Sequence, residues 1–572
     1  MSKDESDDEK GQELQEKTED EKHISCWPRY FPDGYCSELK HVLKLATPMI
    51  LIQCTQMLMG PIALMFCGHL GKNELDAVSL AVSIINLTVF SAATGLATAC
   101  DTIFSQTYGS VHRHKLGICL QKSLLIITLG TLPVWALYLN TGDILILLGQ
   151  DFTISWLVDR YMKLYMPGVL FFYIYISFAK YLQTQNIVAP SVIIGIIANL
   201  VNAALHYLFV YHLGWGTDGS AVAMDLAFFL LLLLTILYII VFKIYKETWS
   251  GWQRECLADW GIFGKIAFFG LLMICFEWWA FEFSIFAAGI IGTTDLGAQS
   301  VIYQNEMIWF MFPFGTGIAA SIRVGQFLGA KEPMKARATA WVSLSLMAVV
   351  AVGVAVLFTS LRNYLPFVFT RVPDVVELAA HVFPILGLFT IVDALAGVGT
   401  GIIRGCGRQA LGTIVIALGY TGALLVGVPI MLKITEDIIT MWICLCCAVG
   451  LEAVVILIFI IKTNWRKEVE KAEERIKITE LEGNEESKPV LHSDQFSSDK
   501  KSSYETIGID STRENKTSLR RLLVFRGLVI IAFFLVFVAG LLCRLGLHDG
   551  TLIDNFNQTV SLNQTYQSRT LP

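Results

Sequence analysis

Charged residues are scarce in this chain. Of its 572 residues, only 16% are Asp, Glu, Lys or Arg, whereas 54% are hydrophobic. Mean hydropathy is +0.57, and apolar runs of about 20 residues recur, the length that a helix needs to cross a bilayer. So little charge excludes an ordinary soluble globular protein. Because repeated spans in lipid must satisfy their own backbone hydrogen bonds, the sequence predicts an all-α membrane protein.

Several motifs of catalysis and nucleotide binding are also absent. The sequence contains no GxxxxGK[ST] phosphate loop, no HExxH zinc motif and no GxSxG nucleophile elbow. Nothing therefore supports an ATP-driven pump or a hydrolase. The net charge of −6 lies largely in the tails, which gives no electrostatic support for nucleic-acid binding. We expect no enzymatic activity, no cofactor and no nucleic-acid partner.

No cysteine or histidine pattern predicts a metal site. The 13 cysteines are scattered, and many lie within apolar runs. Cys444 and Cys447 have C-x-x-C spacing, but no second pair accompanies them, so buried small residues are favoured over a zinc or redox site. The N-terminus has no signal-peptide pattern, because residues 1–22 are acidic and polar. Membrane insertion is expected to depend on the first span.

Twelve apolar runs form two groups of six, and a thirteenth lies near the C-terminus. The predicted organisation is an acidic tail at 1–40, a first lobe with spans 1–6 at 41–242, a cytoplasmic linker at 243–261, a second lobe with spans 7–12 at 262–461, a polar cytoplasmic segment at 462–520, span 13 at 521–546 and a tail at 547–572. Span 1 is predicted at about 41–66 and span 4 at about 163–182. The start of the polar segment is predicted to form a surface helix, and its remainder and the acidic tail to be disordered.

Basic residues set the expected orientation. Lys and Arg concentrate in the loops after spans 2, 6, 8 and 10, although the loop after span 9 also carries Arg362 and Arg371. Loops rich in Lys and Arg stay in the cytoplasm, so we expect a cytoplasmic N-terminus in a multi-pass plasma-membrane protein. Thirteen spans then place the C-terminal tail outside the cell, where Asn557 and Asn563 lie in sequons and are candidates for glycosylation.

An internal repeat relates the two groups of spans. FCGHLGKNELDAVS at 66–79 aligns without a gap with AAGIIGTTDLGAQS at 287–300, and QTYG at 106–109 aligns with QFLG at 326–329. An even number of spans separates the copies, so both lobes have the same orientation. A pseudo-two-fold axis along the membrane normal follows, with a substrate path between two six-helix bundles. Duplication is compatible with a channel, but two similar rigid lobes favour a transporter that works by alternating access.

Carboxyl groups interrupt the seventh apolar run. Glu277 and Glu282 lie in GLLMICFEWWAFEFSIFAAG, where a lipid-facing carboxylate would cost about 2.5–3.5 kcal/mol or more. Trp278 and Glu282 are i,i+4 neighbours on a helix and can line one wall together. A carboxylate beside an indole suits an organic cation, through charge pairing and cation–π attraction. The alternative is a pair of carboxyls kept neutral or paired inside the bundle.

The acidic residues belong to one lobe only. Asp393 lies near the middle of span 10, with glycines after it that allow helices to approach closely or bend. At the offset of the repeat, Glu277, Glu282 and Asp393 fall on residues of the first lobe that are not acidic. Ion coupling is therefore expected in the second lobe.

The motifs CGHLGKNELDAVSLA, ACDTIFSQTYGS, ECLADW, EWWAFE, LGAQS, RVGQFLGA and RGCGRQALG together resemble the multidrug and toxin extrusion (MATE) family, over residues 40–465. The extra terminal span resembles the vertebrate members. The resemblance implies two six-helix bundles and proton- or sodium-coupled export of organic cations, with proton exchange in the vertebrate branch. It also implies that acidic residues of spans 7, 8 and 10 handle protons and cations, and Glu277, Glu282 and Asp393 match the first and last of these.

One position departs from the family pattern. Gln304 stands where the resemblance implies a span 8 carboxylate, and Glu306 follows two residues later. Two residues are about 200° apart around a helix, so Glu306 is not predicted to substitute. Proton stoichiometry and substrate range are therefore left open. Cys67 resembles a family cysteine that is sensitive to thiol reagents.

Other polar residues of the spans have two interpretations each. Gln53 and Asn86 resemble polar lining positions of the first lobe. Tyr303, Trp278 and Trp309 can line a cavity, with core or interface packing as the alternative. Asp225 and Glu452 are expected to be paired or solvated at helix ends, and Asp101 is expected to lie in water near the cytoplasmic end of span 2.

These observations predict a secondary active antiporter, working as a monomer, that exports organic cations and drugs in exchange for protons. In the outward-facing state a proton neutralises a carboxylate and weakens its hold on the bound cation. Loss of the proton in the inward-facing state restores the negative site, and a new cation binds. Coupling therefore requires the proton and the cation to compete for the same charge. A sodium-coupled exporter, a passive channel and a lipid flippase remain alternatives.

Overall fold

The computed structural model describes residues 35–257, 260–435, 437–481 and 531–543. All the regular structure in these ranges is helical, which confirms the all-α prediction. Eleven of the described helices are long and apolar enough to cross a membrane, and the number is twelve when one bent pair is counted as a single span.

The helices of residues 35–257 are α2 (Tyr35–Met57), α3 (Met59–Cys67), α4 (Lys72–Ile85), the π-helix η2 (Asn86–Phe90), α5 (Ser91–Gly109), η3 (Arg113–Lys115), α6 (Leu116–Leu129), α7 (Thr131–Leu139), α8 (Thr141–Leu147), α9 (Phe152–Leu164), α10 (Met166–Thr184), α11 (Ala189–His206), η4 (Tyr207–His212), α12 (Gly216–Val241), η5 (Ile244–Glu247) and η6 (Arg254–Leu257). Those that follow are α13 (Trp260–Ile291), α14 (Thr293–Gly329), α15 (Pro333–Ser360), η7 (Leu365–Val368), α16 (Pro373–Gly405), α17 (Gln409–Ile430), η8 (Met431–Thr435), α18 (Ile438–Lys462), α19 (Trp465–Leu481) and an unlabelled helix, Ile531–Cys543. We call residues 35–241 the first lobe and 260–462 the second lobe.

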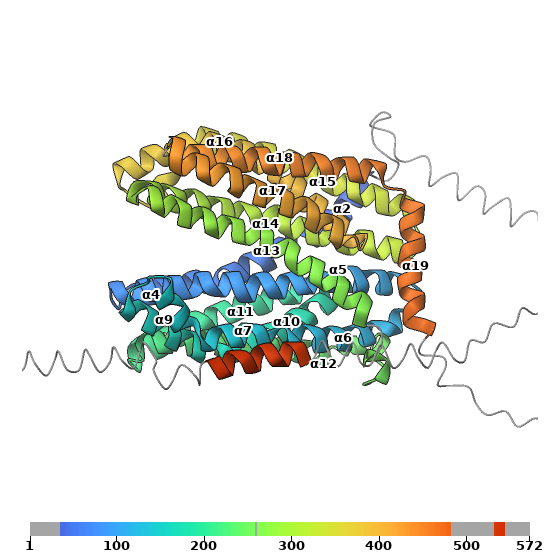
Figure 1. Ribbon diagram of the computed structural model, residues 1–572. Coiled ribbons are helices and arrows are strands. Elements are labelled where there is room, and N and C mark those ends of the chain that lie inside the picture. Colours follow the sequence, from blue (N-terminus) through green and yellow to red (C-terminus); the bar gives the residue numbers. More distant parts are fainter. Residues whose placement is uncertain (1–34, 258–259, 436, 482–530, 544–572) are drawn as a thin grey trace, which may run out of the picture.

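The two lobes lie side by side, closest at the end where α19 lies and further apart at the opposite end (Figure 1). Each lobe has its own apolar core. The first helix of each lobe also packs on the other lobe: α2 contacts α14 and α15, and α13 contacts α5. Glu38 on α2 accepts hydrogen bonds from Arg323 on α14, at 2.7 Å from Nε and 2.6 Å from a terminal nitrogen. The predicted boundary at residue 41 therefore falls inside α2.

The repeated segments meet where the lobes are closest. A Cβ atom at Gly109, at the end of α5, would lie 2.0 Å from the carbonyl oxygen of Gln326 on α14. A Cβ atom at Gly329, at the end of α14, would lie 2.0 Å from the carbonyl oxygen of Gln106 on α5. The two contacts are equivalent under a two-fold relation between the aligned segments. Glycine at both positions lets the two backbones touch.

The span predicted at 163–182 is longer and bent. Its helix begins at Phe152, and α9 and α10 meet at a 49° angle. Asp151 caps α9 by accepting hydrogen bonds from the backbone N–H groups of Thr153, at 2.8 Å, and Ile154, at 3.2 Å. Pro167 lies in the first turn of α10, where its missing N–H removes the bond that would continue α9. The bent pair therefore begins about 11 residues before the predicted span, at Phe152. Span 1 is likewise divided, into α2 and α3.

The helix predicted at the start of the polar segment is present as α19, which crosses the ends of both lobes (Figure 1). Glu468 is buried and forms an ion pair with Arg408 of the second lobe. Arg475 donates to the Gln106 side-chain oxygen in the first lobe, at 3.1 Å, and to the Cys406 carbonyl in the second, at 3.1 Å. This helix therefore fastens the two lobes together at one end.

The described part of span 13, Ile531–Cys543, packs on α7 of the first lobe. Asn140 donates to the Gly540 carbonyl at 2.9 Å, and a Cβ at Gly540 would lie 2.7 Å from that of Ala136. Small residues at a crossing of this kind allow helices to pack closely in a membrane. The two predicted glycosylation sites, Asn557 and Asn563, lie outside the described residues.

Candidate functional site

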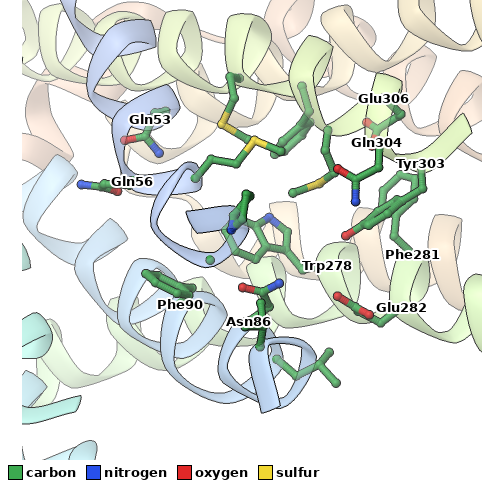
Figure 2. Close-up of a pocket in the computed structure, with 18 of the residues that line it drawn as sticks. Gln53, Gln56, Asn86, Phe90, Trp278, Phe281, Glu282, Tyr303, Gln304 and Glu306 are labelled. Carbon is green, nitrogen blue, oxygen red and sulfur yellow. The ribbon is translucent and has the colours of Figure 1, made fainter. Parts of the chain in front are cut away.

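A cavity of about 150 Å³ lies between the lobes. Its walls come from α2, α3, α4, η2 and α5 of the first lobe and from α13 and α14 of the second. Figure 2 shows the principal lining side chains: Gln53, Gln56, Asn86, Phe90, Trp278, Phe281, Glu282, Tyr303, Gln304 and Glu306. Glu277 lines the cavity as well.

Three carboxyl groups reach this cavity, all of them from the second lobe. Glu277 and Glu282 come from α13, and Glu306 comes from α14. Glu277 is 7% exposed and Glu306 is 1% exposed. Neither oxygen of Glu306 has a hydrogen-bond partner, and none of the three groups forms an ion pair within the described ranges. Buried carboxyls without a partner are costly when ionised, so a ligand that supplies positive charge is favoured there.

Asp393 lies behind the cavity wall and does not line it. Its side chain, on α16, is 1% exposed. Phe389, one turn before it on α16, packs on Phe281 of the cavity lining, with ring centroids 6.2 Å apart. Of the three acids singled out in the sequence, two therefore line the cavity, and the third lies on a helix that packs against the lining.

Glu306, which was not predicted to substitute for the missing span 8 carboxyl, reaches the cavity. Gln304 and Glu306 both line the cavity (Figure 2), although Gln304 is exposed and Glu306 is buried. The angular argument concerns the direction in which a side chain leaves the helix. It omits the length of a glutamate side chain and the depth to which the cavity extends between α13 and α14. This chain therefore places a span 8 carboxyl in the cavity from position 306.

Aromatic rings form much of the second-lobe wall. The ring centroids of Phe281 and Tyr303 lie 6.1 Å apart. Trp278 and Glu282 both line the cavity, as their i,i+4 spacing predicts. The indole N–H of Trp278 has no hydrogen-bond partner in the structure. Trp309 is buried outside the lining, so its interpretation as core packing is the one that the structure supports.

The first-lobe wall carries no charge, and its three amide side chains lie among apolar residues such as Met57 and Leu64. Gln53, Gln56 and Asn86 line the cavity together (Figure 2). The Gln56 amide donates a long hydrogen bond of 3.4 Å to the Tyr175 hydroxyl. Cys67 is fully buried and is not among the lining residues, so the structure does not bring it to the cavity.

Three further acids of the spans are buried. Asp101 is fully buried and pairs with Lys180 at 2.8 Å, so the prediction that it lies in water is wrong. The reason is that α5 continues for two turns beyond it, to Gly109. Asp225 and Glu452 are 8% and 3% exposed, and each has a carboxyl oxygen without a hydrogen-bond partner. Helix-end solvation is therefore excluded for both.

Comparison with known proteins identifies the fold and its family. The MatE family model matches residues 48–208 and 271–430, one match in each lobe. Multidrug and toxin extrusion protein 1 of Homo sapiens is 38% identical over 535 residues, covering 89% of this chain and 94% of the human protein. Multidrug and toxin extrusion protein 2 of Mus musculus is 39% identical over 439 residues, covering 77% of each chain.

Solved structures agree with this assignment. The eukaryotic MATE transporter AtDTX14 superposes with a TM-score of 0.74 at 27% identity, covering 78% of this chain and all of that one. The Vibrio cholerae MATE transporter VcmN, in its bent form, superposes with a TM-score of 0.66 at 17% identity, covering 77% of this chain and 99% of that one, which supports the fold alone. The family match in both lobes and the identity to the human protein lead to one conclusion: this chain belongs to the MatE family and is a multidrug and toxin extrusion transporter.

Proposed function

We propose that this transporter exports organic cations in exchange for protons, by alternating access between its two lobes. The observation that carries the proposal is the cavity between the lobes, where Glu277, Glu282 and Glu306 line one side with aromatic rings. None of these carboxyls is neutralised by an ion pair within the described residues. A cation that enters supplies the missing positive charge.

The chemistry of the walls favours cations of organic character. Trp278, Phe281 and Tyr303 offer aromatic faces, to which a cation is attracted by about 0.5–2 kcal/mol. Gln53 and Asn86 on the opposite wall offer hydrogen bonds without charge. A small inorganic ion gains little from such a surface, whereas an ammonium or guanidinium group with an apolar body uses both walls.

Proton coupling follows when two ligands compete for one charge. A proton on Glu277 or Glu306 removes the negative charge that holds the guest, so a protonated site releases the cation. Loss of the proton on the other side of the membrane restores the charge, and a new cation binds. Exchange of one proton for one monovalent cation conserves charge, so the membrane potential would have little effect on it.

We place the end of the molecule that carries α19 in the cytoplasm. Basic residues gather there, including Arg113, Lys331 and Arg408, as loops retained in the cytoplasm require. The lobes touch at this end, so the conformation corresponds to a state closed toward the cytoplasm. We expect the transporter to act as a monomer in the plasma membrane.

Uptake of labelled tetraethylammonium into proteoliposomes tests the proposal. With an acidic lumen, proton efflux is expected to drive accumulation above the equilibrium level, and collapse of the pH gradient with a protonophore should abolish the accumulation. Uptake that only equilibrates would indicate a channel. Accumulation that follows a sodium gradient at constant pH would indicate sodium coupling. Movement of a fluorescent lipid without uptake of the cation would indicate a flippase.

Glu306 provides a specific test of the cavity. Glu306→Gln is expected to lower proton-driven uptake about tenfold, equivalent to about 1.4 kcal/mol, because one of the three lining charges is lost. The double variant Gln304→Glu with Glu306→Gln returns a carboxyl to the same cavity two residues earlier and should recover part of the uptake. Full activity in Glu306→Gln would remove Glu306 from the site.

A further inference from the structure

A buried cation lies at the seam between the lobes. Arg404 on α16 is 1% exposed, and its backbone carbonyl accepts a hydrogen bond of 2.6 Å from the Thr102 hydroxyl on α5. Its guanidinium carbon lies 5.7 Å from the centre of the Phe314 ring, and its Nε has no hydrogen-bond partner. Among the described residues no carboxylate lies close enough to form an ion pair with it. A buried guanidinium without an ion-pair partner carries a desolvation cost, which negative charge nearby offsets.

Two acids from different lobes act on this cation. On the first-lobe side, Asp101 precedes Thr102, whose hydroxyl donates to the Arg404 carbonyl. On the cavity side, the Phe314 ring beside the guanidinium lies 6.3 Å from the ring of Trp278, which follows Glu277 in the chain. The buried guanidinium therefore attracts a carboxylate on each side. Asp101 already pairs with Lys180 at 2.8 Å within the first lobe. All four groups are more than nine-tenths buried. A row of alternating charges therefore leads from the cavity, across the seam and into the first lobe: Glu277, Arg404, Asp101 and Lys180.

We propose that Arg404 couples occupancy of the cavity to closure of the lobes, because Glu277 and Asp101 compete for its charge. When Glu277 is ionised and empty, its negative charge partly compensates that of Arg404 within the second lobe, and the attraction of Arg404 across the seam is weakened. When a proton or a guest cation neutralises Glu277, the second lobe presents uncompensated positive charge to Asp101. Closure at the α19 end is then favoured. The inference rests on the proposed function only in assigning Glu277 as the group that a proton or guest occupies.

Other charged groups lie on both sides of the seam, and Arg475 on α19 bonds to both lobes at the closed end. On the cavity side, Glu306 lines the cavity with Glu277, and Asp393 and Glu452 are buried in the same lobe, so their carboxyls increase the demand for positive charge. The Tyr420 side chain, on α17, is buried in that lobe as well. On the far side, Asp101 has Lys180 as its ion-pair partner. Arg404 is the buried cation of α16 that lies between the two groups.

A distance measurement across the closed end tests the proposal without transport. Spin labels at Val111→Cys and Met334→Cys, which are 90% and 69% exposed, report the separation of the lobes in the full chain, reconstituted with its exposed cysteines replaced by serine. At about pH 8, Glu277→Gln, which imitates the neutral site, is expected to raise the ratio of closed to open molecules by about threefold or more. Acidification to about pH 5.5 should have the same effect on the unmodified site.

Removal of the shared charge separates coupling from structure. In an Arg404→Gln background, Glu277→Gln should no longer change the distance distribution, whereas Arg404→Lys, which keeps the charge, should restore part of the response. Asp101→Asn serves the same purpose should Arg404→Gln not fold, because it removes the partner across the seam. A response to Glu277→Gln that is undiminished in both backgrounds would overturn the proposal.

The two proposals fail in different ways. If the unmodified protein does not accumulate tetraethylammonium under a pH gradient but Glu277→Gln changes the distance as expected, the proposed function is rejected and the coupling is supported. If uptake is normal but the distance response to Glu277→Gln does not depend on Arg404, the coupling is rejected and the proposed function is supported.

Discussion

Glu277→Gln is expected to abolish proton-driven export of organic cations while the protein still folds and reaches the membrane. Glu277 lines the cavity, is 7% exposed and has no ion-pair partner among the described residues. Glutamine keeps its shape and hydrogen-bonding capacity but can neither hold a proton nor pair with a guest. Loss of one partner from a buried charge pair costs about 2–5 kcal/mol, so uptake should fall by at least about 30-fold. Uptake per molecule of surface protein measures the effect.

A buried carboxyl outside the cavity provides the control. Asp225 in α12 is 8% exposed and does not line the cavity. Asp225→Asn makes the same chemical change within the first lobe, and export should persist. Equal losses of export in Asp225→Asn and Glu277→Gln would mean that both buried carboxyls are needed for folding and that neither has a specific role in transport. Normal export by Glu277→Gln would remove the central residue from the proposed site.

Helices were predictable from the sequence where a span is uniformly apolar, and less so where its boundaries are set by local hydrogen bonds. Apolar runs of about 20 residues indicated most of the membrane helices. The extension of α9 to Phe152 was missed because the residues that begin it are mixed in polarity. Its signal was Asp151, whose carboxylate accepts from two backbone N–H groups. The bend that follows was marked by Pro167.

The kinds of residue in the site were more predictable than which of their side chains reach the cavity. Glu277 and Glu282 were singled out because carboxyls are costly in a membrane, and both line the cavity. Asp393 met the same criterion but lies behind the wall, and Glu306 failed an angular criterion yet lines the cavity. Depth in the bundle depends on which helices pack together, and one helix considered alone does not contain that information. Arg404 illustrates this most clearly, because Thr102, whose hydroxyl donates to its carbonyl, is far from it in sequence.

Gly109→Ala is expected to open the α19 end. The added Cβ would lie 2.0 Å from the Gln326 carbonyl oxygen, a backbone atom that cannot turn aside. Overpacking of this kind costs about 1–3 kcal/mol. The contact exists only between lobes, so the cost falls on the closed conformation and not on the fold of either lobe. The ratio of closed to open molecules should fall roughly 5- to 150-fold, measured by spin labels at Val111→Cys and Met334→Cys.

The internal repeat supplies a second variant, and α15 a control. Gly329→Ala makes the equivalent collision with the Gln106 carbonyl, also at 2.0 Å, so it should open the same end by a similar amount. Gly353 on α15 has no neighbouring atom within 4 Å of such a Cβ, so Gly353→Ala should leave the distance unchanged. Because export requires repeated closure, uptake should fall in each of the two variants, Gly109→Ala and Gly329→Ala. Unchanged distances in both variants would show that the repeated glycines do not hold the lobes closed.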